Sequence, residues 1–142
     1  MYSHIMYSHI NKAPQWAMFR STAPTAPNGV VPLVLRGQDA SNSHTVSGGV
    51  VDLLVGKTYL ISAGLPDDSS KTVKNVEIQR STNGGSTWST IWGSGLSGAT
   101  GGTSAGTSVI DVYTTTVPTK LRLNTGKTGL PAAGAWLYIE VK

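Results

Sequence analysis

Few side chains in this sequence could carry out nucleophilic or acid–base chemistry. A serine–histidine–acid triad could be assembled from Ser43, His44 and Asp39, which lie in one short polar stretch. Serine hydrolases place the nucleophile on a sharp glycine-flanked turn beside oxyanion donors, and Ser43 has no such surroundings. We therefore interpret these three residues as part of a polar loop.

Glycoside hydrolysis would require two carboxylates on either side of the scissile bond. Turn formation after a proline explains Asp67 and Asp68. Asp111 lies in an expected strand, so it is the one acid to examine for burial and a perturbed pKa. The acidic residues are Asp39, Asp52, Asp67, Asp68, Glu77, Asp111 and Glu140. Their pattern predicts no catalytic residue, and we expect no enzymatic activity.

Metal-binding and cofactor-binding patterns are also missing from the sequence. There is no cysteine, and His4 and His9 form a pair without a third ligand nearby. The glycine-rich stretch 93–107 does not end in the Lys-Ser/Thr of a phosphate loop. We expect neither a metal nor a cofactor.

The composition favours β-structure. Gly, Ser and Thr are abundant, only 13% of the residues are charged, and Glu occurs twice. Exposed helices need Glu, Lys and Gln, whereas Val and Thr are common in strands. The sequence therefore predicts strands joined by loops of small residues.

Alternating and β-branched stretches place about eight strands after residue 28. The segments 50–55 and 58–63 are expected to form a hairpin around Gly56-Lys57. In the last strand, Leu137, Ile139 and Val141 should face one way and Trp136, Tyr138 and Glu140 the other. The expected strands are 30–36, 46–55, 58–63, 73–80, 87–92, 108–116, 120–124 and 135–141. We predict an all-β antiparallel sandwich over 29–142, jelly-roll-like, with an immunoglobulin-like sandwich as the alternative.

Residues 1–28 are predicted to form an extended N-terminal arm. Pro14, Pro24 and Pro27 disfavour regular pairing. The aromatic content nevertheless exceeds that of a disordered tail, so we expect the arm to bind a partner subunit. Its proposed contact residues are Tyr2, Tyr7, Trp16, Met18 and Phe19. Residues 1–5 recur as 6–10, either as a duplicated start or cloning remnant, or as repeated Tyr and Ile anchors.

One short motif resembles the Asp-box of sialidases and related β-propellers, Ser-x-Asp-x-Gly-x-Thr-Trp. The matching residues are Ser81, Gly85, Thr87 and Trp88, with Asn83 at the aspartate position. The resemblance implies a structural hairpin turn between the strands 73–80 and 87–92. It covers eight residues and has a single copy, whereas a propeller repeats it in each blade. We therefore expect the turn and not the sialidase activity.

Charge and hydropathy limit the partners. The net charge is +4, but the basic residues are scattered, so we do not expect nucleic-acid binding. No apolar run approaches the ~20 residues of a membrane span, and no secretory signal is visible. We expect a product that is made in a host cytoplasm and has no membrane partner.

Taken together, the short cysteine-free chain, the Ser/Thr/Gly-rich strands and the arm before a sandwich resemble the cement or decoration proteins of tailed-bacteriophage capsids. This resemblance implies a virion structural protein, a homo-oligomer (a homotrimer) and the major capsid protein as partner. An arm would add contact area, and many copies on a lattice would raise avidity.

A carbohydrate- or receptor-binding module, such as that of a phage tail fibre, is the alternative function. Sugar rings stack on exposed aromatic side chains. The candidates for such stacking are Trp92, Trp136 and Tyr138. Two or three of these rings would have to be exposed and roughly coplanar on one shallow surface.

Overall fold

The computed structural model describes residues 15–65, 75–91, 96–97, 107–127, 129–130 and 133–142. In these ranges the regular elements are all strands. They are β1 (Trp16–Ser21), β2 (Leu33–Gln38), β3 (Thr45–Ser47), β4 (Val50–Leu53), β5 (Thr58–Leu65), β6 (Asn75–Ser81), β7 (Ser89–Thr90), β8 (Leu96–Ser97), β9 (Thr107–Thr114), β10 (Thr119–Thr125) and β11 (Trp136–Val141).

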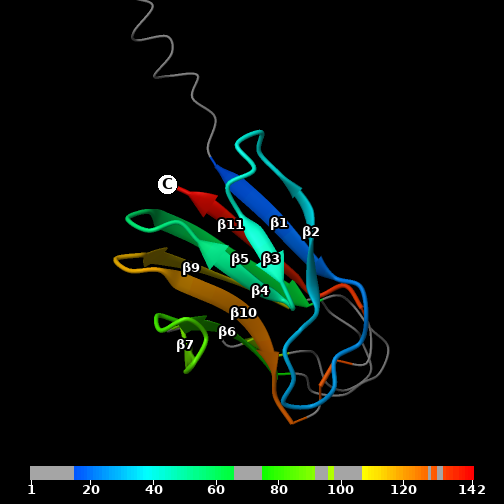
Figure 1. Cartoon of the computed structure of the whole chain (residues 1–142). Coiled ribbons are helices and arrows are strands. Elements are labelled where there is room, and N and C mark those ends of the chain that lie inside the picture. Colours follow the sequence, from blue (N-terminus) through cyan, green and yellow to red (C-terminus); the bar gives the residue numbers. More distant parts are fainter. Residues whose placement is uncertain (1–14, 66–74, 92–95, 98–106, 128, 131–132) are drawn as a thin grey trace, which may run out of the picture.

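The strands form two facing sheets, seen as two layers in Figure 1. The first sheet has the order β2-β1-β11-β5-β9, and the second has the order β3-β4-β10-β6-β7, with β8 also paired to β6. All strand pairs are antiparallel. From β4 to β6 and again from β8 to β11, the chain changes sheet at each connection. The expected all-β, jelly-roll-like sandwich is therefore confirmed.

The core fills the space between the sheets with alternate residues of each strand. Along β10, Leu121 and Leu123 are fully buried while their neighbours are partly exposed. The same alternation occurs along β11, where Leu137 and Ile139 point inward. The largest fully buried apolar or aromatic side chains are Tyr59, Phe19, Ile61, Ile78, Leu121, Leu123, Leu137 and Ile139. Period-two patterning of this kind is what a sandwich core requires.

The prediction that residues 1–28 form a separate arm is wrong for β1. Trp16–Ser21 lies between β2 and β11 inside the first sheet, so the sandwich begins before the expected boundary at residue 28 (Figure 1). Phe19 pairs with Leu137 and has no exposed surface. Pro24 and Pro27 follow β1, so they remove no donor from its ladder, and Pro14 lies outside the described residues.

The predicted hairpin between 50–55 and 58–63 is also wrong. β4 belongs to the second sheet and β5 to the first, so the turn at Gly56-Lys57 crosses between sheets. Thr115 fastens this crossing, because its Oγ1 donates to the Leu54 carbonyl at 2.6 Å and its amide donates to the Lys57 carbonyl at 2.9 Å. The hairpin partner of β4 is β3, across Gly48 and Gly49.

The sequence correctly predicted the hairpin of β6 and β7. Gln79 and Arg80 pair with Thr90 and Ser89 across the turn that carries the Asp-box-like motif. The other described strand partner of β6, besides β8, is β10. The turn therefore joins β7, the last strand in the order of the second sheet, to its neighbour β6.

Candidate interaction face

An aromatic surface covers the outer side of the first sheet at β1 and β11. Inward positions on these strands hold core residues, so the alternate positions hold side chains that face outward. We call the group Trp16, Met18, Trp136 and Tyr138 the aromatic face. Each of the four side chains is partly exposed. The two strands are adjacent, with Met18 opposite Tyr138 in their register.

Two rings of the aromatic face are nearly parallel. The centroids of Trp16 and Tyr138 lie 6.3 Å apart, with an angle of 28° between the ring planes. This offset arrangement is favourable for aromatic pairs. Partial burial raises the pKa of the Tyr138 hydroxyl, and the neighbouring Glu140 carboxylate adds to the effect. The hydroxyl therefore remains neutral at physiological pH.

Trp136 lies flat because β5 has a glycine beneath it. Gly64 is opposite Trp136 in the register of β5 and β11. A Cβ atom at Gly64 would be only 2.3 Å from the indole, closer than any real contact of that kind. Gly64 is thus a residue of the site that sequence reasoning missed. Its only signal was a glycine directly after the expected strand 58–63, a position where a missing side chain allows a close approach.

Charges flank the aromatic face at its two ends. Arg20 is opposite Trp136, and Glu140 is opposite Trp16, so the cation and the carboxylate lie at opposite ends of the two strands. Leu60 on β5 and the exposed Val112 on β9 extend the apolar surface sideways. The face thus combines rings, aliphatic side chains and one charge of each sign.

The outer side of the second sheet is different in character, and we call it the polar face. Lys120 and Asp52 form an ion pair at 2.6 Å. Arg122 donates from Nε to Gln79 at 2.8 Å, and Thr90 donates to Glu77 at 2.6 Å. Polar side chains on this face therefore have partners within the chain, which is typical of a surface that faces water.

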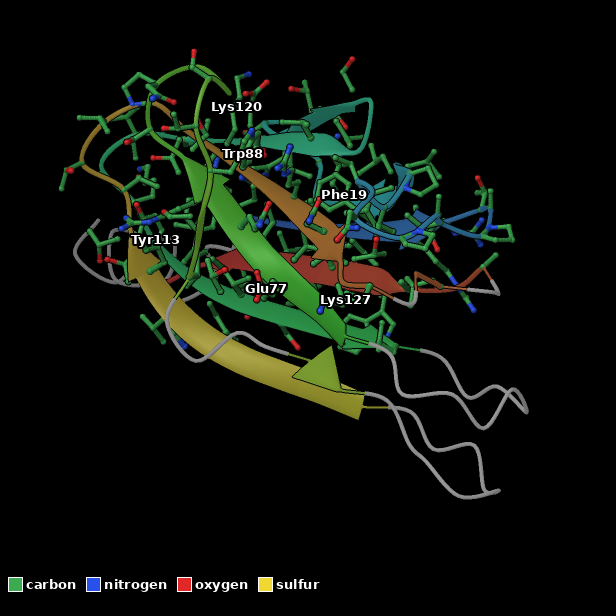
Figure 2. All side chains as sticks on the ribbon, turned by 90° about the horizontal axis from the view of Figure 1, so that it is seen from below. Phe19, Glu77, Trp88, Tyr113, Lys120 and Lys127 are labelled. Carbon is green, nitrogen blue, oxygen red and sulfur yellow. The ribbon has the colours of Figure 1, made fainter. Side chains whose placement is uncertain are left out.

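The Asp-box-like residues form a closed turn on the polar side. Asn83 Oδ1 accepts from the Ser81 hydroxyl at 2.9 Å and from the Thr87 amide at 3.0 Å. Trp88 folds back and donates from Nε1 to the Gly85 carbonyl at 3.0 Å. Figure 2 shows Trp88 and Lys120 at this end of the molecule. The Arg122 guanidinium lies 4.0 Å from the Trp88 ring centroid, so these groups support the hairpin.

The other residues that were predicted to form contacts lie in different parts of the molecule. Of the proposed arm contacts, Phe19 is in the core and Trp16 and Met18 belong to the aromatic face, whereas Tyr2 and Tyr7 lie outside the described residues. Of the sugar-stacking candidates, Trp136 and Tyr138 lie on the aromatic face. Trp92, Asp67, Asp68 and the Asp111 side chain also lie outside the described part, as do His4 and His9.

No triad forms from Ser43, His44 and Asp39. The His44 ring is buried and its Nε2 is 2.9 Å from the Tyr59 hydroxyl, while the Ser43 hydroxyl bonds to Ser41. Among the described residues there is no group of three or more His, Asp or Glu side chains placed to hold a metal ion. The same part of the chain contains no helix with the length and apolar character needed to cross a membrane.

The chain is similar in fold to proteins of known structure. No protein-family model matches the sequence, and no curated protein is significantly similar to it. A crystal structure of murine APRIL at pH 8.0 has a TM-score of 0.67 and 8% identity, over 92% of this chain and 100% of that one. The globular domain of zebrafish complement 1qA protein has a TM-score of 0.60 and 11% identity, over 92% and 96%. At such identities, the chain shares with these proteins the fold of a two-sheet β-sandwich.

Proposed function

We propose that this chain is a non-enzymatic structural subunit that associates with copies of itself through the aromatic face. The main support for this proposal is the contrast between the outer surfaces of the two sheets. Polar side chains of one are paired within the chain, whereas the other presents half-buried rings. Burying apolar surface contributes ~25 cal/mol per Å², so covering such a face favours association.

The ends of the face suit such an interface. Arg20 and Glu140 lie at opposite ends of the paired strands, so a second copy can place a carboxylate near each guanidinium. Charges arranged in this way add orientation more than affinity. The rings supply the affinity, because aromatic side chains dominate the energetics of protein interfaces.

The setting we propose is a phage virion, with the chain as a capsid decoration subunit. The support is the resemblance to cement proteins, which implies a homotrimer and the major capsid protein as partner. The aromatic face would be covered by other copies, and Tyr2 and Tyr7 remain the proposed contacts to the shell. An oligomer with several such contacts would bind a lattice with high avidity.

A charge placed on the aromatic face tests the self-association. Met18→Glu puts a carboxylate beside Tyr138 on β1, whereas Gln79→Glu puts the same charge on the polar face, where it still accepts from Arg122. We expect Met18→Glu to lower the native mass to that of a monomer and Gln79→Glu to leave it unchanged. Equal native masses for the two variants would contradict the proposal.

Carbohydrate binding is the second candidate function, because the nearly parallel Trp16 and Tyr138 rings could stack on a sugar. The same rings cannot bind a sugar and a second subunit at once. A glycan-array signal from the unaltered protein that disappears in Trp136→Ala would favour this alternative. No signal from a correctly folded protein would count against it.

A further inference from the structure

His44 is a buried titratable residue with no role in the proposed interface itself. Its side chain has 1% of its surface exposed, and it packs against the core edge-on to Tyr59, with ring centroids 5.7 Å apart. It lies just before β3, at the end of the segment 39–44 that leaves β2. Within this segment His44 is the only fully buried side chain.

The hydrogen bonds of the imidazole suit its neutral form. Nε2 lies 2.9 Å from the Tyr59 hydroxyl, which itself accepts the Leu54 amide at 2.9 Å. The phenol proton is therefore available to be donated to Nε2. Nδ1 is buried and has no partner among the described residues. With Nε2 as the acceptor, the single proton of the neutral ring is on Nδ1. Protonation would add a proton to Nε2, so the phenol proton would lose its acceptor and the buried ring would carry a charge.

The surrounding charges do not reverse this preference. Burial lowers the pKa of His44 from its usual value near 6.5, and the Asp39 carboxylate opposes this with a smaller effect. Asp52 on the neighbouring β4 faces outward to Lys120, Lys57 beyond it is exposed, and Arg36 on β2 is also exposed. Asp39 itself stays ionised, because a hydrogen bond from Ser41 lowers its pKa.

The same segment is attached to the Trp16 end of the aromatic face. Asp39 Oδ1 accepts from the Trp16 amide at 3.0 Å, and the Asp39 amide donates to the Trp16 carbonyl at 3.1 Å. Gln15 Nε2 donates to the Ser43 hydroxyl at 3.2 Å. Movement of the segment would therefore disturb the start of β1.

We propose that His44 is an acid-sensitive latch: protonation of its imidazole expels the ring from the core, opens the segment 39–44 and loosens the Trp16 end of the aromatic face. The latch rests on the geometry of His44, and its effect on assembly rests on the proposed self-association. Because the unfolded or opened state binds the proton more tightly, closure is fully stable above about pH 6.5 and weakens as the pH falls below that value.

The test compares hydrogen exchange and native mass at about pH 7.5 and about pH 5, with exchange times scaled for the intrinsic rates. Three proteins are needed: the unaltered chain, His44→Gln, and the double variant His4→Gln/His9→Gln. The last removes the other two histidines and leaves His44 in place, so it is the matched control.

In the unaltered chain and the control, we expect protection of the amides in 39–44 to fall by more than about tenfold at the lower pH. We also expect the oligomer to dissociate, so that the native mass decreases. In His44→Gln, both should be independent of pH. Segment opening in a protein that is already monomeric at neutral pH would support the latch and contradict the self-association. Opening without loss of mass would overturn the link to assembly.

Two results would overturn the latch itself. One is a segment that stays closed at the lower pH in the unaltered chain, and the other is equal opening in His44→Gln. If His44→Gln does not fold, the imidazole of the unaltered chain is titrated by NMR. A pKa below the usual value near 6.5 is then expected, and one at or above it would reject the latch.

Discussion

At the scale of single residues, Gly64 determines whether Trp136 can lie flat on β5. A methyl group at this position would meet the indole at 2.3–2.5 Å, so either the ring moves or the strands separate. We expect Gly64→Ala to lower the free energy of unfolding by about 1–3 kcal/mol, the usual cost of overpacking. Thermal or denaturant unfolding, followed by tryptophan fluorescence, measures the change.

Gly37 provides the control for this substitution. A Cβ there would meet the Trp16 ring at 3.6 Å, which is an ordinary contact, and its backbone does not have a positive φ. Gly37→Ala should therefore leave stability within about 1 kcal/mol of the unaltered protein. Equal losses in the two variants would show that the tight approach at Gly64 has no special role.

Asn83 is the residue on which the Asp-box-like turn depends. Its carbonyl oxygen accepts two hydrogen bonds, and its Nδ2 donates to the Thr87 hydroxyl at 2.7 Å. We expect Asn83→Ala to cost about 1–2 kcal/mol, because polar groups of the turn lose their partner. Asn83→Asp should retain most of the stability, since a carboxylate can accept the same bonds. Denaturant unfolding would reject this account if both variants were equally unstable.

At the scale of elements, β1 changes the expected consequence of shortening the chain. Residues 15–28 include a strand with neighbours on both sides and the buried Phe19 (Figure 2). A protein beginning at Gln15 should keep its cooperative unfolding transition, whereas one beginning at Gly29 should lose it. Circular dichroism and thermal melting distinguish the two. A stable fold without β1 would restore the view of residues 1–28 as a separate arm.

The reason β1 escaped sequence analysis is physical. Its inward residues Ala17 and Phe19 alternate with Trp16 and Met18, which are also apolar, so the strand has no polar–apolar alternation. Its partner β11 lies more than a hundred residues later in the chain. By contrast, the β6–β7 hairpin is local, and the Asp-box-like motif at its turn predicted it directly.

The connection from β4 to β5 also could not be predicted from the local sequence. A short glycine turn between two apolar segments is compatible with a hairpin or with a change of sheet. The change of sheet is stabilised by Thr115, which is distant in the sequence and donates hydrogen bonds to the carbonyls of Leu54 and Lys57. Local patterns therefore predicted most strands, the sandwich and the β6–β7 hairpin, but not the pairs between strands that are distant in the sequence.

At the scale of the whole molecule, sequence patterns identified the four residues of the aromatic face as candidate contacts but did not predict that they lie side by side. Trp136 and Tyr138 were assigned to one face of the last strand, and Trp16 and Met18 to a separate arm. Only the pairing of β1 with β11 joins them. The resulting sandwich has one polar and one aromatic outer surface, which is the basis of the proposed assembly.

Sedimentation equilibrium of the unaltered protein over a range of concentrations tests the central claim most directly. A self-associating aromatic face predicts a native mass that is a multiple of the 14.8 kDa chain, and three times that mass if the homotrimer is correct. The mass should fall toward that of one chain on dilution. A protein that remains at 14.8 kDa at all concentrations would contradict the account.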